Sequence, residues 1–416
     1  MFVDITLENF RSVKEAQTLS FESITDRRLR TDHVIDVDDR TSLLKYCSIA
    51  GPNGVGKSTV VRALEMLQGM VLATEEDNNP LLRLSGASFA YDSICKRSPS
   101  SIQIQIIRGE DEETGLPIYY TYSLRADNKR VYNESLYQRI GRASSKLFER
   151  ELITSEDSEE ESYYVFSYGK KYIGVKKRFS NKLPENKLFL GNAARAESAS
   201  LMPIFEWFRD DCVIIPIGLS PMSEDFILKA MKRYPSLKGC MLEFLHNMDF
   251  IDIKDFNIVE KEGAKDRLVY IHGVNRSRYA SYFSSESLGT RRITMMAVVI
   301  WQAMQKNMFL VADDFGLLLH DTILNELFEK FSYETRLSKS QMLTTGVDLT
   351  PLKKGQHRFD EIWLTSKDSE GSTRYYSLAD FVMRKNDSVK DMYLNGAYGS
   401  VPILSECVHR RMREEK

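Results

Sequence analysis

The chain has 416 residues, of which 42% are hydrophobic and 28% are charged. These fractions are ordinary for a folded protein and exclude the collagen-like, coiled-coil and intrinsically disordered classes. The formal net charge of -2 gives no overall attraction to nucleic acid or anionic lipid, so a contact with either would have to be local.

Membrane and secretory segments are not expected from this sequence. The longest apolar stretch, residues 293–301, is far shorter than the ~20 residues of a membrane helix. The N-terminal segment has neither the basic start nor the apolar centre of a signal peptide. The five cysteines are scattered and show no CxxC spacing, so neither a disulfide framework nor a zinc site is indicated. We therefore expect a cytoplasmic protein without membrane contact.

The first elements in chain order are strands followed by a helix. Residues 2–7 alternate apolar and polar side chains, which predicts a strand, and a second strand is predicted at 46–50. Apolar residues then recur at helical spacing from Val60 to Val71, so the glycine-rich segment between joins a strand to a helix. Two more alternating strands are predicted at 101–109 and 117–125.

The middle of the chain changes in character. Residues 154–162 hold five acidic residues and no apolar one, which predicts a solvated loop within an insertion. Residues 169–182 then place six basic residues around Tyr172 and Phe179. This pattern suits the charged face of a hairpin, or a grip on a phosphate backbone with bases stacked on the two rings.

The remaining pattern returns to helices and a strand. Helical spacing is found over residues 199–209 and 224–247, and residues 268–273 are predicted to form a strand. The chain has no internal repeat and no heptad run, so a long coiled-coil arm is not expected.

The segment GPNGVGKS fits the G-x-x-x-x-G-K-[ST] phosphate loop. Its glycines let backbone N–H groups turn inward onto phosphate oxygens, Lys57 reaches the β and γ phosphates, and Ser58 offers a hydroxyl to Mg²⁺. The predicted nucleotide contacts are Gly51, Pro52, Asn53, Gly54, Val55, Gly56, Lys57, Ser58 and Thr59. The sequence therefore predicts binding of ATP with Mg²⁺.

The segment FLVADDFG, residues 309–316, is an apolar run that ends in two aspartates. A buried unpaired carboxylate costs several kcal/mol, so such a pair is expected beside a cation or hydrogen-bond donors. Asp313 is predicted to bind Mg²⁺ together with the loop serine, and Asp314 is predicted to act on the attacking water. The predicted catalytic residues are thus Lys57, Asp313 and Asp314, and the metal ligands are Ser58 and Asp313.

Six motifs in order resemble the AAA15/AAA21 group of ABC-type ATPases, relatives of SMC-type and OLD-type heads. They are ITLENFRSVKE at the start, GPNGVGKST, SSESLGTRR as the signature, MFLVADDFGLLLHD, QMLTTGV at the switch, and YLNGAYGSVP near the C-terminus. Many members of this group are found in bacterial anti-phage and abortive-infection systems. The resemblance covers nearly the whole chain.

This resemblance implies a mixed α/β, P-loop NTPase of ABC-ATPase type, a two-lobed head with an α/β insertion. We expect an N-terminal lobe at 1–130, an insertion at 131–275 and a C-terminal lobe at 276–416. In such heads the signature of one subunit completes the ATP site of the other. Ser287 and Gly289 therefore imply a homodimer or higher oligomer that sandwiches nucleotide head to tail, with the helix that follows directing its positive end to the γ-phosphate.

Two positions depart from the family pattern. Asp314 stands where a Glu is usual, and its carboxylate is one methylene shorter, so a misplacement of about 1 Å could slow hydrolysis on the order of 10²-fold. Gly346 stands where the switch His is usual and has no side chain to donate or accept a hydrogen bond. These departures indicate slow hydrolysis, unless Asp348 or His320 takes a supporting role.

Three functional hypotheses follow. The preferred one is a nucleotide-dependent sensor or scaffold of a bacterial anti-phage system that controls a separately encoded effector, a nuclease or a toxin. The second is a DNA-engaged repair or maintenance ATPase, which would bind nucleic acid through Lys176, Lys177 and Arg178. The third is a scaffold that holds ATP permanently without hydrolysis.

Overall fold

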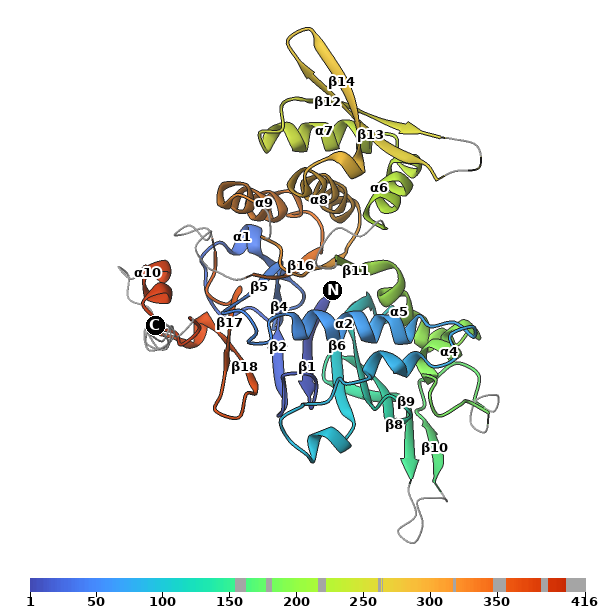
Figure 1. Ribbon diagram of the computed structural model, residues 1–416. Helices are drawn as coiled ribbons and strands as arrows, with labels where there is room; N and C mark the ends of the chain where they lie inside the picture. The colour runs from blue at the N-terminus through green and yellow to red at the C-terminus, as the bar shows by residue number, and fades with distance from the viewer. Residues whose placement is uncertain are drawn as a thin grey trace, which may run out of the picture.

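The computed structural model describes residues 1–153, 162–176, 182–215, 222–260, 263, 265–316, 319–346, 357–382 and 388–401. None of the helices in these ranges combines the length and apolar character that crossing a bilayer requires. The described residues form a mixed α/β fold in which a central sheet has a larger sheet on one side and a helical layer on the other (Figure 1).

The central sheet has six strands and positions the functional site. In spatial order they are β11 (Cys212–Ile215), β15 (Phe309–Ala312), β16 (Gln341–Thr345), β5 (Tyr46–Ala50), β17 (Ile362–Lys367) and β18 (Thr373–Ser377). The first five run parallel, and β18 pairs antiparallel with β17.

Both faces of this sheet are covered, which explains why β11 and β15 are continuous apolar runs. Ile49 and Val311 pack into the core on the side of helix α2 (Ser58–Val71). Tyr46 and Leu310 point the other way, into a core shared with α8 (Leu288–Gln305) and α9 (Asp321–Glu334). Figure 1 shows α8 and α9 on one side of the sheet and α2 on the other.

The second sheet has seven antiparallel strands and lies on the α2 side. In spatial order they are β10 (Tyr163–Tyr168), β9 (Ala143–Ile153), β8 (Val131–Ile140), β7 (Pro117–Ala126), β6 (Ser100–Glu110), β1 (Phe2–Glu8) and β2 (Gln17–Ser20). The antiparallel neighbours along the chain are joined as hairpins, which fits the alternating pattern of residues 101–125.

The remaining elements surround these sheets. Strands β12 (Ile253–Val259), β13 (Arg267–Val274) and β14 (Ser277–Tyr282) form a third sheet, and β3 (Val34–Asp36) pairs with β4 (Ser42–Leu44). The other α-helices are α1 (Arg30–His33), α4 (Phe189–Arg195), α5 (Met202–Glu206), α6 (Met222–Arg233), α7 (Leu237–Asn247) and α10 (Val389–Leu394).

The two large sheets are joined at the N-terminal strand. The side chain of the fully buried Gln341 accepts a hydrogen bond from Phe2 N at 2.6 Å and donates to Phe2 O at 3.0 Å. The rings of Phe2 and Phe309 stack with centroids 4.3 Å apart. A hydrogen-bonded contact and an aromatic contact therefore fix the start of β1 against the first residues of β15 and β16.

Two expectations from the sequence are corrected here. The helical region 224–247 is two helices, α6 and α7, because Pro235 lies between them and has no N–H to continue a helix. The ring of Tyr172 is only 5% exposed and its hydroxyl donates to Val175 O, so it is not available to stack on a base.

Other expectations lie outside the described residues. These are most of the acidic loop, at 154–161, together with Lys177, Arg178 and Phe179. The division into lobes at residues 130 and 275 stays a prediction. Strands β7 and β8 pair with each other across the first of these boundaries.

Candidate nucleotide-binding site

The phosphate loop lies between the carboxyl end of β5 and the start of α2, as the sequence predicts. Gly54 and Gly56 adopt φ values of 76° and 109°, a left-handed region in which a side chain is strained. At Gly56 a Cβ would also collide with the hydroxyls of Thr373 and Ser12. Gly56 is therefore required both for its conformation and for the close approach of β18.

Strand β18 supports the outside of this loop. Thr373 Oγ1 donates to Val55 O at 2.6 Å, and Tyr375 Oη donates to Gly56 O at 2.7 Å. Ser12, from the segment after β1, is within 2.9 Å of Thr59 Oγ1 and 2.7 Å of Thr373 Oγ1. Strand β18 therefore holds two carbonyl groups of the loop in place through hydrogen bonds.

Lys57 is folded onto its own loop. Its ammonium donates to Gly51 O and Pro52 O, both at 2.8 Å, and only 6% of the residue is exposed. Burial lowers the pKa of Lys57, and the Asp314 and Asp313 carboxylates offset part of this shift. A polyphosphate in the loop would give this buried cation a negative partner in place of two neutral carbonyls.

Asp313 lies at the end of β15 and faces the first residue of α2. Its Oδ1 accepts from Ser58 Oγ at 2.8 Å and from Thr345 Oγ1 at 2.6 Å. The residue is 1% exposed, and Oδ2 has no hydrogen-bond partner among the described residues. A buried carboxylate oxygen of this kind, next to a hydroxyl, fits a hard divalent cation such as Mg²⁺.

Asp314 follows in a left-handed conformation, with φ of 46°. Such a backbone costs about 1 kcal/mol in a non-glycine residue and is tolerated best by Asn and Asp. The conformation is held by Thr345 Oγ1, which accepts from Asp314 N at 2.8 Å. Burial raises the pKa of Asp314 and the Asp313 carboxylate adds to this, whereas Lys57 and Arg292 lower it.

Arg292 connects the signature helix α8 to this pair of aspartates. Its guanidinium donates to Asp314 O at 2.7 Å and to Asp313 O at 3.2 Å, and the residue is 4% exposed. The predicted signature and the predicted metal-binding strand are therefore joined within one copy of the chain by Arg292, the last residue of the signature SSESLGTRR.

The signature residues lie at the N-terminus of α8. Ser287 caps the helix, since its Oγ accepts from Thr290 N at 3.1 Å. Ser287 and Leu288 are exposed, Gly289 is half-buried, and none of them lines the pocket at the phosphate loop of the same copy. Behind the cap, His272 Nε2 is 3.0 Å from Glu286 Oε1 and Nδ1 is 2.8 Å from Asp252 Oδ2.

A pocket of about 590 Å³ opens at the phosphate loop. It brings together the predicted residues Asn53, Gly54, Gly56, Lys57, Ser58, Thr59 and Asp314. Its lining also includes residues that were not predicted to contact a ligand, among them Arg11, Arg62, Tyr91 and Lys367. With Lys57, four cationic side chains face one carboxylate, which suits a polyanionic ligand such as a nucleoside triphosphate.

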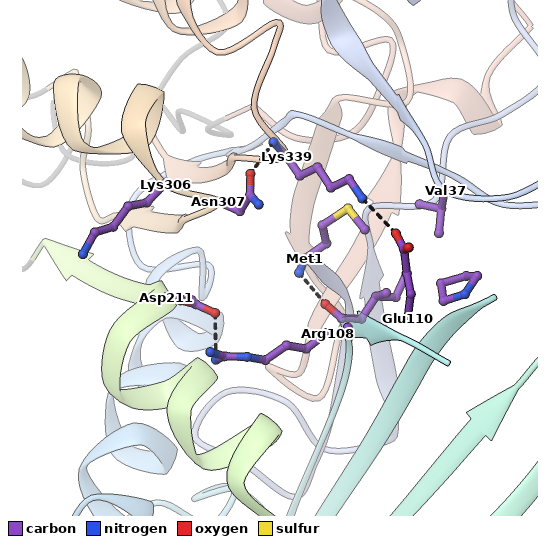
Figure 2. Close-up of a pocket in the computed structure, with 11 residues that line it drawn as sticks. Met1, Val37, Arg108, Glu110, Asp211, Lys306, Asn307 and Lys339 are labelled. Atoms are coloured by element: carbon purple, nitrogen blue, oxygen red, sulfur yellow. Dashed lines mark hydrogen bonds and ion pairs between the residues drawn. The ribbon is translucent and has the colours of Figure 1, made fainter. Parts of the chain in front are cut away.

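A second pocket, of about 540 Å³, lies beside Met1 at the start of β1 and is drawn in Figure 2. Four of its charged groups pair with one another. Arg108 contacts Asp211 at 2.8 Å, and Lys339 contacts Glu110 at 3.7 Å. It contains none of the predicted site residues.

At the switch, the side chain that contacts the two aspartates belongs to Thr345, the residue before Gly346. Gly346 follows it and has no side chain, and Asp348 lies outside the described residues. His320 is exposed, and its Nδ1 accepts from Thr322 N at the start of α9. The threonine hydroxyl, in contrast, contacts both aspartates.

We expect Thr345→Val to reduce ATP turnover and to destabilise the fold by about 1–3 kcal/mol, because the buried Asp313 Oδ1 loses a donor and the half-buried Asp314 N–H loses its acceptor. Valine keeps the volume of threonine but cannot hydrogen bond. Urea unfolding of the nucleotide-free protein and the steady-state rate of ATP hydrolysis measure the two effects.

Thr345→Ser keeps the hydroxyl and should retain both properties. The matched control is Thr344→Val, since Thr344 is equally buried but bonds to Ser48, at 3.2 Å. If the two valine variants lost turnover equally, the specific role of Thr345 would be disproved.

The loop, the pair formed by Ser58 at the start of α2 and Asp313 at the end of β15, and the parallel sheet that positions them define a P-loop nucleoside triphosphatase of the ABC head type. A family model described as "AAA domain, putative AbiEii toxin, Type IV TA system" matches residues 48–345. The chain belongs to this family, AAA21, which confirms the resemblance seen in its motifs.

Solved structures of SMC heads are similar to the chain. An SmcHead bound to the C-winged helix domain of ScpA is 13% identical with a TM-score of 0.48, and 90% of this chain and 97% of that chain are covered. The SMC head domain from Thermotoga maritima is 12% identical with a TM-score of 0.41, covering 90% and 98%. An Smc head domain derived from Pyrococcus furiosus, bound to the C-terminal domain of ScpA, is 10% identical with a TM-score of 0.45, covering 90% and 96%. A comparison with proteins of curated function gives no match.

Proposed function

We propose that the chain binds ATP with Mg²⁺ in the pocket at the phosphate loop and hydrolyses it slowly. The observation that carries this proposal is Asp313, whose Oδ1 binds the Ser58 hydroxyl while the buried Oδ2 is left without a described partner. Ser58 and Asp313 would hold Mg²⁺, which when bound neutralises charge on the phosphates.

The chain's own residues then have distinct tasks. Lys57 would leave the carbonyls of Gly51 and Pro52 and bind phosphate oxygens. Asp314, whose raised pKa brings it closer to that of a useful base, would orient the attacking water and accept its proton. Its short side chain reaches less far than that of glutamate, and hydrolysis is slow for this reason.

A head-to-tail dimer would complete the site. Ser287 and Gly289 lie at an accessible helix N-terminus, and they are not part of the pocket of their own copy. In a second copy they would present donors and the positive end of α8 to the γ-phosphate. Arg292 would then transmit the contact to Asp313 and Asp314 of its own chain.

The biological role proposed for this switch is that of a sensor or scaffold in a bacterial anti-phage system of the abortive-infection kind, acting on a separately encoded nuclease or toxin. The description of the family, which names a putative toxin and a toxin–antitoxin system, supports this setting. ATP acts as a switch only if the partner binds one nucleotide state more tightly than the other.

The dimer is tested by light scattering of the purified protein with and without Mg-ATP. We expect the mass to double with Mg-ATP, most completely in Asp314→Asn, in which hydrolysis is blocked. Ser287→Arg should stay monomeric while it still binds ATP, because the new side chain obstructs the surface offered to the second copy.

Ser144→Arg, at an exposed position of β9, is the control for an added charge. A parent that binds ATP and stays monomeric, or a Ser287→Arg variant that dimerises as the parent does, would contradict the sandwich.

In cells, Lys57→Ala should abolish any protection against phage that the parent gives together with its genomic neighbours.

A further inference from the structure

The pocket at the phosphate loop contains one feature that phosphate binding does not use. Tyr91 is the one aromatic side chain among the described residues that line it, and 75% of its surface is exposed. An exposed aromatic residue is ordinary by itself. Here, however, it stands at the rim of the cavity that contains Gly56, Lys57 and Ser58.

The ring of Tyr91 is held in position from two sides. Its edge meets the buried ring of Phe89, with centroids 5.8 Å apart and planes at 70°. It also lies against Gly371 in the β17–β18 turn, since a Cβ on that glycine would be 3.1 Å from Tyr91 Cδ2. The glycine leaves room for the ring, and the remaining surface of the ring faces solvent.

The segment that carries Tyr91 is tied to the site. Phe89 N donates to Asn9 Oδ1 at 3.0 Å, and the Asn9 amide donates to Cys95 O at 2.8 Å. Lys14 bridges Asp92, at 3.1 Å, and Glu370, at 2.7 Å, so it joins the segment to the turn that contains Gly371. These contacts fix the position of the ring before any ligand arrives.

The lining beside the ring is small. Gly86, Ser88 and Ala90 belong to the same segment and line the same pocket. A flat group can therefore approach the ring without displacing a large side chain. A nucleoside triphosphate whose phosphates are held by the loop offers one flat apolar group, its base, and stacking of bases on aromatic rings is favourable for any base.

We propose that Tyr91 is the platform on which the base of the bound nucleotide stacks, and that the site therefore distinguishes nucleotides from inorganic polyphosphate. This inference rests on the proposed function, since it assumes that the phosphate loop binds a nucleoside triphosphate. It assigns to the segment between η1 (Pro80–Leu84) and β6 a role in ligand binding.

The test is calorimetric measurement of the dissociation constants of Mg-ATP and Mg-tripolyphosphate for the parent, Tyr91→Ala and Tyr91→Phe. Tyr91→Ala should weaken Mg-ATP roughly thirtyfold, the middle of the range measured for base stacking on aromatic side chains. It should leave the affinity for Mg-tripolyphosphate unchanged, and Tyr91→Phe should bind both as the parent does. Tyr163→Ala, which removes an exposed ring on β10, is the control.

The other outcomes distinguish a failure of this inference from a failure of the proposed function. If Tyr91→Ala leaves Mg-ATP affinity unchanged, or weakens Mg-ATP and Mg-tripolyphosphate equally, the base does not stack on Tyr91 and the inference is overturned while the proposed function stands. If the parent binds neither ligand, the proposed function fails and the inference fails with it. If Tyr91→Ala changes the mass of the ATP-bound protein but not its affinity, the ring contacts a second copy and not the base.

Discussion

Replacing Asp313 with asparagine is expected to lower ATP turnover by roughly 10²- to 10³-fold, because a metal ion supplies several kcal/mol of charge stabilisation and each 1.4 kcal/mol is tenfold in rate. Asparagine has nearly the same shape, and its Oδ1 can still accept from Ser58 and Thr345. The nucleotide-free protein should be about as stable as the parent, since the substitution removes a buried charge whose Oδ2 has no hydrogen-bond partner among the described residues.

Two measurements separate these effects. Thermal unfolding without nucleotide reports on the fold, and the increase of Tm on adding Mg-ATP reports on the site. The variant should lose most of the increase that depends on Mg²⁺, whereas Asp391→Asn, at an exposed position of α10, should keep it. A variant that kept the full Mg²⁺-dependent increase would show that the metal is held elsewhere.

Changing Asp314 should alter the rate in opposite directions according to the substitution. Asp314→Glu extends the carboxylate by one methylene and is expected to raise kcat, by up to about 10²-fold if reach is limiting. Asp314→Asn should reduce kcat to the background level, because an amide cannot accept the proton of the attacking water. Steady-state hydrolysis at saturating Mg-ATP measures both.

The same residue sets the expected pH dependence. Burial and the neighbouring Asp313 raise the pKa of Asp314, and only the ionised form can act as a base. In kcat/KM, which reports on the free protein, activity should therefore be full above the raised pKa and fall as the pH drops through it, at a higher pH than an ordinary aspartate would give. An unchanged kcat in Asp314→Glu, or an acidic limb at the ordinary aspartate pKa, would count against limited reach and against the proposed base.

The phosphate loop and Asp313 could be predicted from the sequence because each belongs to a short contiguous motif. The strand at 46–50 and the change to helical spacing after Thr59 are confirmed as β5 and α2. The proximity of Ser58 and Asp313, 255 positions apart, is confirmed by their hydrogen bond. A phosphate loop and a strand that ends in acid have one geometric relation in this class, so their pairing follows from the motifs.

The rest of the site depends on contacts that no local pattern encodes. The role of Thr345 could not be predicted, because a threonine in a strand gives no signal of its own. Tyr91 lies in an irregular segment whose position is fixed by Asn9 and Lys14, far away in the sequence. The strands β8–β10 were missed because their side chains mix burial on both faces, with Glu134 and Arg150 fully buried.

Because Arg292 contacts the main chain and not the side chain of residue 314, the amino acid at that position can change without loss of this contact. The guanidinium binds the carbonyl oxygens of residues 313 and 314, and every amino acid offers the same carbonyl. Aspartate, glutamate or asparagine at position 314 should therefore leave the link to α8 in place. In the proposed function, single substitutions at that position would change the rate of ATP hydrolysis and leave the hydrogen bonds from Arg292 to the main chain intact.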